Sequence, residues 1–449
     1  MKSRSYAKSL YYFNLIILWS LLTLVKPVDA YVAGEFEAAY KSRYITNMNE
    51  DDHQGYQSLM IYAAPEKNSP FQLFFSGDLY EDLNHHDGQF DEIASIYNSW
   101  DSAIHGTVYQ CHGTIKQPVA FLDKLSLGRQ YIHYSLSDHI DGISLQKKSY
   151  GLIQSFQVYC GSPVRYFDES SFSNSIHSGI HLSLKLPQNF LFTVEHQLTD
   201  DEADALSNNH DPFYQTYFSV AKFFNTSYFL KISSVAINDD HIQHIRVDST
   251  CLIDAIALKI NGSYYYQFVE IKNFPESISP LLIQWAPIKP HHIAQIHFTH
   301  KEKEDQWILF GGILYRSLTE GEHETSLNHS YFHQYLGFQI FDWPIPHVDL
   351  TLQGDIWKDI ENNENPFFTT MNCDIEYEKQ GLYQVNLGMA YEMYKYDYYE
   401  DKDEKMDVYT SYLKSKICIT PTFQIQLDYS VDYYDQVDHQ VSLRTRYYF

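Results

Sequence analysis

Ionisable side chains recur at alternate positions in several segments of this sequence. Acidic and basic groups on one wall of an aqueous passage attract or repel ions and bind polar solutes. Successive side chains of a β-strand point to opposite faces, so alternate spacing places such groups on one face. The candidates for a pore-lining wall are Glu35, Glu37, Lys41, Arg43, Asp374, Glu376, Asp428, Asp432, Arg444 and Arg446.

The charge balance indicates which solutes such a wall would favour. The chain has 449 residues, with 57 Asp and Glu against 32 Lys and Arg, and a net charge of −25. Facing acidic and basic walls would set a transverse field, and the acidic excess favours cations or neutral polar solutes over anions. The alternative is that these side chains only hydrate the wall. The same balance argues against nucleic-acid binding, because a phosphate backbone attracts a basic surface.

Sequence motifs of enzymes and of dedicated metal sites are absent. The chain has no GxSxG, HExxH or P-loop pattern, so we expect neither an enzyme nor a cofactor. The segments 82–92, 200–211 and 396–407 are rich in acidic residues and contain ligand types for divalent cations. None has the frame of a dedicated calcium loop. We therefore expect solvated outer loops, with divalent cations as candidate partners.

The five cysteines are widely spaced and odd in number. A zinc site is not indicated, because no compact Cys/His spacing exists. Cys111 and Cys160 are the candidate pair if a disulfide forms. The alternative that we favour is that the cysteines are small buried or lipid-facing thiols.

The elements that carry the ionisable groups are predicted to be long β-strands. In the segment 423–433, Phe423, Ile425 and Leu427 alternate with polar residues, and the segment 437–449 alternates in the same way up to the last residue. Such segments exceed the five or six residues that are usual in soluble strands, and their length suits a tilted crossing of a bilayer. Tyrosine is abundant near their ends, as in interfacial aromatic girdles.

The first thirty residues have the features of a secretory signal. Three basic residues precede a largely apolar stretch at 10–25, and small residues near Ala30 offer a cleavage site. The alternative, a membrane anchor, is disfavoured because the apolar stretch is shorter than the roughly 20 residues that span a bilayer. We expect residues 1–30 to be removed and residues 31–449 to form one domain.

These features together resemble the outer-membrane β-barrel proteins of Gram-negative bacteria. The barrel-assembly machinery reads a last strand with a C-terminal Phe in that class; Val441, Leu443, Tyr447 and Phe449 match it, and Thr445 departs. The resemblance implies an all-β, antiparallel up-and-down transmembrane barrel with an even number of strands, about 18 to 24. It also implies location in the cell outer membrane, with membrane lipid and the assembly machinery as partners.

A shorter resemblance concerns residues 125–146. Their Gly-Arg-Gln and Asp-Gly sequences are similar to a strand, loop and strand passage of some substrate-specific porins and polysaccharide-export barrels. This resemblance implies that Arg129 and Asp141 line the pore near its narrowest part. Strict alternation places Arg129 on the same face as Leu125 and Leu127, so a bulge would be needed. The alternative is an ordinary hairpin.

The arrangement of connections and the polar wall predict a porin-like channel. Long, acidic connections at 46–54, 82–102, 162–173 and 199–211 alternate with short ones, as outer loops and periplasmic turns do. The expected solutes are small polar molecules or ions, with a leaning toward cations and neutral solutes. Two alternatives remain at this point: a non-porous outer-membrane barrel whose acidic loops mediate adhesion or ligand binding, and a soluble secreted carbohydrate-binding β-protein.

Overall fold

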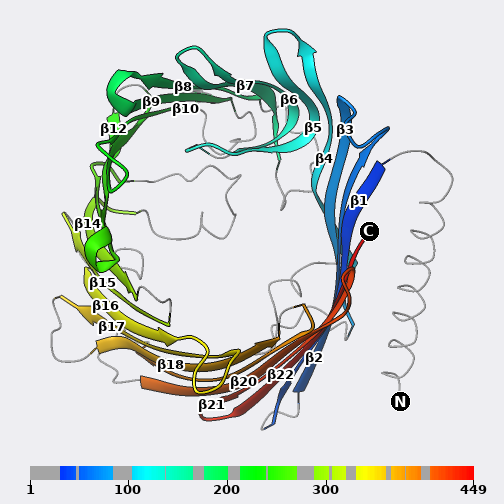
Figure 1. Ribbon diagram of the computed structural model, residues 1–449, viewed down its shortest axis with the longest axis vertical. Helices are drawn as coiled ribbons and strands as arrows, with labels where there is room; N and C mark the ends of the chain where they lie inside the picture. Colours follow the sequence, from blue (N-terminus) through cyan, green and yellow to red (C-terminus); the bar gives the residue numbers. More distant parts are fainter. Residues whose placement is uncertain are drawn as a thin grey trace, which may run out of the picture. The chain divides into compact units, whose positions relative to one another are not determined.

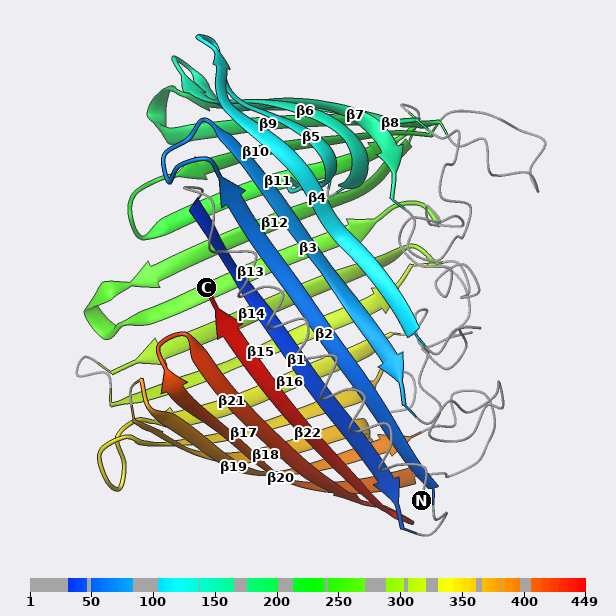
Figure 2. The ribbon, with the colours of Figure 1, turned by 90° about the vertical axis from the view of Figure 1, so that its right-hand side faces the viewer.

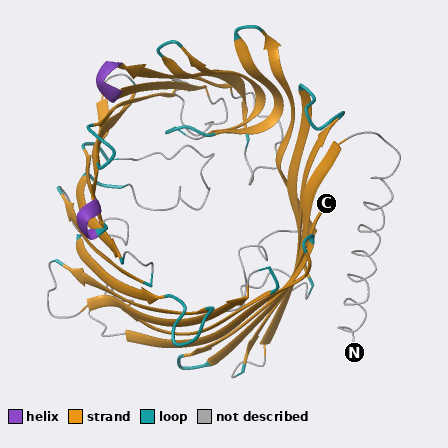
Figure 3. Ribbon diagram, viewed as in Figure 1, coloured by secondary structure: helices purple, strands orange, loops and turns teal. Residues whose placement is uncertain are grey.

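The computed structural model is built almost entirely of β-strands (Figures 1 and 3). It describes residues 31–46, 50–83, 104–136, 138–164, 176–200, 213–238, 241–270, 288–302, 306–319, 330–360, 366–379, 381–395 and 405–449. The predicted signal at residues 1–30 lies outside the described residues. Among those that are described, no helix has the length and apolar character needed to cross a membrane.

The strands are β1 (Tyr31–Ile45), β2 (Glu50–Ala64), β3 (Phe71–Asp82), β4 (Ile104–Val119), β5 (Leu122–Ile132), β6 (Asp138–Tyr150), β7 (Ile153–Pro163), β8 (Ile176–Leu186), β9 (Phe190–Asp200), β10 (Phe213–Phe223), β11 (Tyr228–Ile237), β12 (His241–Ile253), β13 (Leu258–Gln267), β14 (His291–Lys301), β15 (Trp307–Leu318), β16 (Tyr331–Ile340), β17 (Val348–Asp359), β18 (Pro366–Lys379), β19 (Tyr383–Lys395), β20 (Lys405–Thr420), β21 (Phe423–Tyr433) and β22 (Val437–Tyr448). Two single-turn 3-10 helices, η2 (Pro187–Asn189) and η3 (Asp254–Ile256), occupy connections.

All 22 strands belong to one sheet, and the sheet closes on itself. The first strand pairs antiparallel with the last, from Glu35 opposite Tyr448 to Ile45 opposite Asp438. The terminal Phe449 extends this seam: its backbone accepts a hydrogen bond from Gly34 at 2.9 Å and donates one back at 3.1 Å. Figure 2 shows the strands tilted side by side. The structure therefore confirms the predicted up-and-down barrel and its even strand number.

Backbone contacts divide the strands into two units. The first comprises residues up to 116, residues 378–387 and residues 410–449, and it contains the seam between β1 and β22. The second comprises residues 117–377 and 388–409, and it contains β5 through β17 and most of β18. Each candidate site described below lies within one of these units.

The two faces of the sheet have opposite chemistry. Leu427 is paired with Leu443 across β21 and β22, and both side chains are exposed, whereas the next pair, Asp428 and Ser442, lies on the other face. Among the described residues, most buried side chains are polar, and large apolar side chains are exposed on many strands. A continuous apolar outer face is typical of contact with lipid. It disfavours the soluble secreted protein considered above.

The strand ends confirm two further expectations. Exposed aromatic side chains such as Tyr31, Tyr150, Tyr383 and Tyr433 lie at or beside strand ends, where a girdle would meet the membrane interface. Longer connections such as 83–103 and 201–212 alternate with short ones such as 120–121 and 151–152. The connection predicted at 46–54 is shorter than expected, because β2 already begins at Glu50.

All five cysteines are free thiols. The candidate disulfide between Cys111 and Cys160 is therefore not formed. Cys160 is paired with Ile143, and Cys373 with Leu352, on the face that carries exposed apolar side chains. These two thiols therefore fit the lipid-facing alternative.

The opposite faces of β21 lead to a first prediction. Leu427→Arg is expected to destabilise the folded barrel by about 2 to 4 kcal/mol, because it places a charge near mid-bilayer. Urea titration of the barrel refolded into lipid vesicles would measure this free energy of unfolding. The matched variant Asp428→Asn changes the neighbouring residue on the inner face and is expected to leave unfolding unchanged. Equal effects of the two substitutions would contradict the assignment of the faces.

Candidate functional site

Four of the predicted pore-lining residues form an ion-pair cluster at the seam of the first unit. Arg446 Nε lies 2.8 Å from Glu35 Oε1 and donates a hydrogen bond of 3.0 Å to Glu37 Oε2. Arg444 Nε lies 3.2 Å from Glu37 Oε1. The two acids come from β1 and the two bases from β22, and they lie on adjacent strands. They therefore neutralise one another locally, instead of facing each other across the bore as a transverse field requires.

A further ion pair closes the same seam nearer its other end. Arg43 of β1 binds Asp438 of β22, with its Nη2 and Nε atoms 2.7 and 2.8 Å from Asp438 Oδ2. The Asp438 side chain is 2% exposed. Tyr434, in the connection before β22, lies beside this pair, and burial and the Asp438 carboxylate raise the pKa of its phenol. Tyr434 therefore stays protonated at neutral pH.

The inner wall of the first unit also forms an open cavity of about 400 Å³. Lys41, Arg43 and Asp428, three of the predicted pore-lining residues, contribute to its lining, together with Lys414 of β20. Asp428 accepts hydrogen bonds from Gln426, and Asp432 accepts one of 2.7 Å from Thr410. These residues lie on the polar face, as the alternation of β21 predicts.

Asp374 and Glu376 lie in the second unit, on β18. They are paired with Thr351 and Asp349 of β17. The same face of these strands carries Asp355, which accepts a hydrogen bond from Thr370. The structure therefore places both acids on the polar face of a different unit from the seam cluster.

In the second unit the β5–β6 hairpin crosses the inner face of the sheet. Gly128, Gly142 and Gly161 are aligned across β5, β6 and β7. A Cβ atom on Gly142 would lie 2.5 Å from the Gly161 Cα, and one on Gly161 would lie 2.6 Å from the Asp141 carbonyl oxygen. Only glycine permits this close approach of strands. The strands β5 and β6 curl inward beyond this row (Figure 1).

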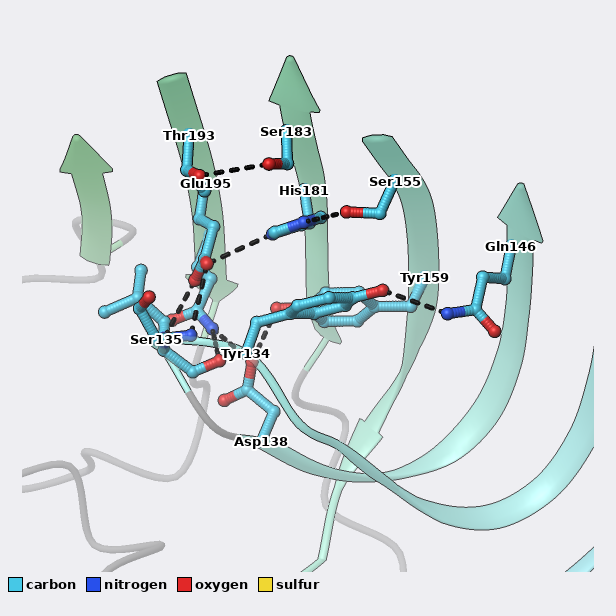
Figure 4. Close-up of polar contacts among 12 residues, drawn as sticks. Tyr134, Ser135, Asp138, Gln146, Ser155, Tyr159, His181, Ser183, Thr193 and Glu195 are labelled. Carbon is cyan, nitrogen blue, oxygen red and sulfur yellow. Dashed lines mark hydrogen bonds and ion pairs between the residues drawn. The ribbon is translucent and has the colours of Figure 1, made fainter. Parts of the chain in front are cut away.

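The tip of this hairpin is fixed to the inner wall by hydrogen bonds to two carboxylates (Figure 4). The backbone N–H groups of Ser135 and Leu136 donate to Glu195 of β9, at 3.1 and 2.8 Å. Asp138, at the start of β6, accepts hydrogen bonds from Tyr159 and from Gln197 of β9. Strands β6 and β9 are three positions apart in the sheet, about 14 Å at the usual spacing. These contacts therefore require the tip to lie over β7, β8 and β9.

Apolar packing supports the same position of the hairpin. Ile132 and Ile140, on either side of the tip, are almost fully buried and form a cluster with Tyr159 of β7. The Tyr134 ring packs against this cluster and stacks on His181 at 3.6 Å between ring centroids. An apolar cluster on the inner face of a barrel that is otherwise lined by polar groups holds the hairpin in place by excluding water.

Arg129 and Asp141 are brought together at the base of this folded tip. They are directly paired across β5 and β6, and the Arg129 Nε and Nη2 atoms donate to the two carboxylate oxygens at 2.9 and 2.7 Å. The pairing of β5 and β6 from Lys124 to Ile132 runs without a register shift. The expected bulge is therefore absent. The pair lies on the same face as Leu127, opposite the face that is buried. The strands change direction at the row of Gly128, Gly142 and Gly161, and not at a bulge.

Sequence reasoning missed the residues that hold the hairpin. His177 Nε2 lies 2.8 Å from Asp138 Oδ2, and His181 Nδ1 lies 3.1 Å from Glu195 Oε1. Glu195 is 3% exposed and His181 is 6% exposed. The sequence signal that was available is the alternation of polar residues along β8 and β9. It indicates that these side chains lie on the polar face, but it does not indicate which residues they contact.

Metal binding has no support within the part of the chain that the structure describes. No group of three or more His, Cys, Asp or Glu side chains is close enough there to hold an ion. The acidic connections predicted as candidate cation sites lie almost wholly outside the described residues.

The fold and its two faces define the class: this is an outer-membrane β-barrel fold. It is similar to the translocation pore of the P pilus usher PapC, with a TM-score of 0.53 and 8% sequence identity. The match covers 93% of this chain and 99% of the PapC chain. OccAB4 of Acinetobacter baumannii matches over 94% and 99%, with a TM-score of 0.45 and 10% identity. OpdK of Pseudomonas aeruginosa matches over 93% and 99%, with a TM-score of 0.42 and 8% identity. No family model and no curated protein sequence matches.

Proposed function

We propose that this protein is a porin-like channel of the outer membrane for small polar solutes and ions. The observation that carries this proposal is the polar inner face of a closed sheet whose outer face is apolar. A barrel of this size has room for an aqueous lumen that is narrowed by chain inside it.

The β5–β6 hairpin supplies the narrowing in this proposal. Its buried face packs on β7 to β9, so its other face, with the Arg129–Asp141 pair, is presented to the solutes that pass. These two side chains are 30% and 42% exposed. A bidentate ion pair of this kind offers both a donor and an acceptor to a polar solute.

The charge of the wall favours cations in this proposal. The Arg and Glu side chains at the seam neutralise one another, whereas the chain as a whole carries 57 Asp and Glu against 32 Lys and Arg. Asp428, on the polar face, accepts its hydrogen bonds from the neutral amide of Gln426. Negative groups along a pore wall lower the free energy of a passing cation and raise that of an anion.

Planar-bilayer recording of the refolded protein tests the proposal. We expect stepwise conductance and, in a salt gradient, a reversal potential that shows cations permeating better than anions. Asp428→Asn is expected to reduce this cation preference without changing the yield of folded barrel. A correctly folded barrel that gives no conductance would refute the channel and favour the non-porous alternative.

A further inference from the structure

We propose that Ser155, His181 and Glu195 form an acyl-transfer site on the inner wall of the second unit. Ser155 Oγ lies 2.9 Å from His181 Nε2, and His181 Nδ1 lies 3.1 Å from Glu195 Oε1 (Figure 4). The three side chains come from the adjacent strands β7, β8 and β9. A hydroxyl on Nε2 and a carboxylate on Nδ1 is the arrangement by which serine hydrolases activate their nucleophile.

The tautomer of His181 follows from its partners. Glu195 accepts two backbone hydrogen bonds from the hairpin. An ionised carboxylate has no proton to donate, so in the contact between Glu195 and His181 the Nδ1–H group must be the donor. The proton is therefore on Nδ1, and the lone pair of Nε2 points to the Ser155 hydroxyl. The Tyr134 ring, which is stacked on His181 at an interplanar angle of 12°, fixes the plane of the imidazole. Glu195 acts here as a positioning residue.

The nucleophile is the most accessible member of the set. His181 and Glu195 are buried, whereas Ser155 is only partly buried. Lys148 of β6 is directly paired with Ser155 on the same face, and it is exposed. Paired residues of antiparallel strands have Cα atoms about 5 Å apart. The Lys148 ammonium is therefore within reach of the oxyanion that forms when Ser155 attacks an ester.

The surrounding wall indicates the class of substrate. Gln146, Gln157 and Ser183 flank the three residues on the same face, and Ser183 is hydrogen-bonded to Thr193. The side chains that flank the three residues here are therefore polar. The site therefore suits a short-chain carboxylic ester of a polar solute, such as an acetyl ester.

The reaction balances with these groups and water. Ser155 Oγ adds to the ester carbonyl carbon while its proton moves to His181 Nε2, and the ester C–O bond then breaks as this proton passes to the departing alcohol. Water attacks the acyl-serine with His181 as the base, and the proton returns to Ser155 Oγ. The products are a carboxylic acid and an alcohol.

A second hydroxyl, histidine and carboxylate set provides an internal comparison. His177 Nδ1 lies 2.7 Å from Thr199 Oγ1, and its Nε2 atom lies 2.8 Å from Asp138 Oδ2. The partners of the two ring nitrogens are therefore exchanged relative to His181: in His177 the hydroxyl lies at Nδ1 and the carboxylate at Nε2. The hydroxyl is also that of a β-branched residue, and Tyr159 and Gln197 share the carboxylate.

Labelling with a fluorophosphonate probe tests the proposal on the full-length refolded barrel. We expect the probe to modify Ser155, as located by peptide mass spectrometry, and the protein to hydrolyse p-nitrophenyl acetate. Ser155→Ala should abolish both signals. His181→Ala and Lys148→Ala should slow hydrolysis, the former by roughly 100-fold or more if His181 is the general base.

Matched variants separate this site from an adventitiously reactive serine. Thr199→Ala, which changes the hydroxyl of the comparison set, should label and hydrolyse like the unmodified protein, and heat-modifiable migration on gels verifies that each variant is folded. Absence of labelling at Ser155 in the folded, unmodified barrel would overturn the proposal. So would labelling of Ser155 at an unchanged rate in folded Lys148→Ala and His181→Ala variants.

Discussion

Replacing Glu195 by alanine is expected to release the β5–β6 hairpin from the inner wall and to raise the conductance of the channel. The substitution removes the acceptor of the Ser135 and Leu136 N–H groups. A buried donor without a partner costs about 1 to 3 kcal/mol; because Ser135 is exposed and Leu136 only partly buried, we expect the docked tip to be destabilised by about 1 to 3 kcal/mol in total. Since about 1.4 kcal/mol changes a population tenfold, undocked hairpins would become common.

Two measurements report on this release independently. Single-channel conductance in planar bilayers should rise, because the proposed narrowing is the hairpin docked on the inner wall at β7 to β9. Hydrogen exchange of the amides at Ser135 and Leu136 should accelerate. Glu376→Ala removes a carboxylate from the polar face of β18, away from the hairpin, and should leave the exchange of these two amides unchanged. Fast exchange without a change in conductance would show that the hairpin does not narrow the bore.

The strands were predictable from the sequence because alternation is a local property. The predicted segment 423–433 coincides with β21, and the segment from Val437 coincides with the start of β22. The prediction failed at β2, where the acidic residues Asp51 and Asp52 were assigned to a loop. Both lie on the strand, and Asp52 is paired with Arg43 on the polar face. An aqueous lumen tolerates acids within a strand, which the apolar core of a soluble sheet does not.

The contacts of the candidate site were beyond the reach of the sequence. Alternation identifies the face of Arg43 and Asp438, but these partners are 395 positions apart and meet only when the sheet closes. The docking of Leu136 on Glu195 depends on the bend at Gly142 and Gly161, which no local pattern reveals. Glu35, Glu37, Arg444 and Arg446 share one face of the seam, which alternation does predict. Their local neutralisation at the seam depends on register, which the sequence of one strand does not contain.

Charge reversal at the seam is the second prediction with a large expected effect. Arg43→Asp would place a second carboxylate beside Asp438, whose side chain is 2% exposed. Breaking a buried ion pair costs about 3 to 5 kcal/mol, and the partial exposure of Arg43 places this pair near the lower value. We expect a clear loss of folded barrel after refolding into vesicles, measured as the heat-modifiable fraction on gels. Lys41→Asp, two residues earlier on the same face, changes a residue that is paired with the neutral Gln54 and Ser442 on the neighbouring strands, and it should have a smaller effect.

The double variant Arg43→Asp with Asp438→Arg distinguishes a specific pairing from a general intolerance of acid on β1. It restores opposite charges at the same two positions of β1 and β22, so the folded fraction should recover above that of either single variant. Recovery would mean that the attraction between the first and last strands helps to set the register in which the sheet closes. Opposite charges favour this register, because a slip of two residues would remove Arg43 from Asp438 and Glu37 from Arg446. A double variant that folds no better than Arg43→Asp alone would show that backbone pairing and the outer apolar face set this register without the ion pair.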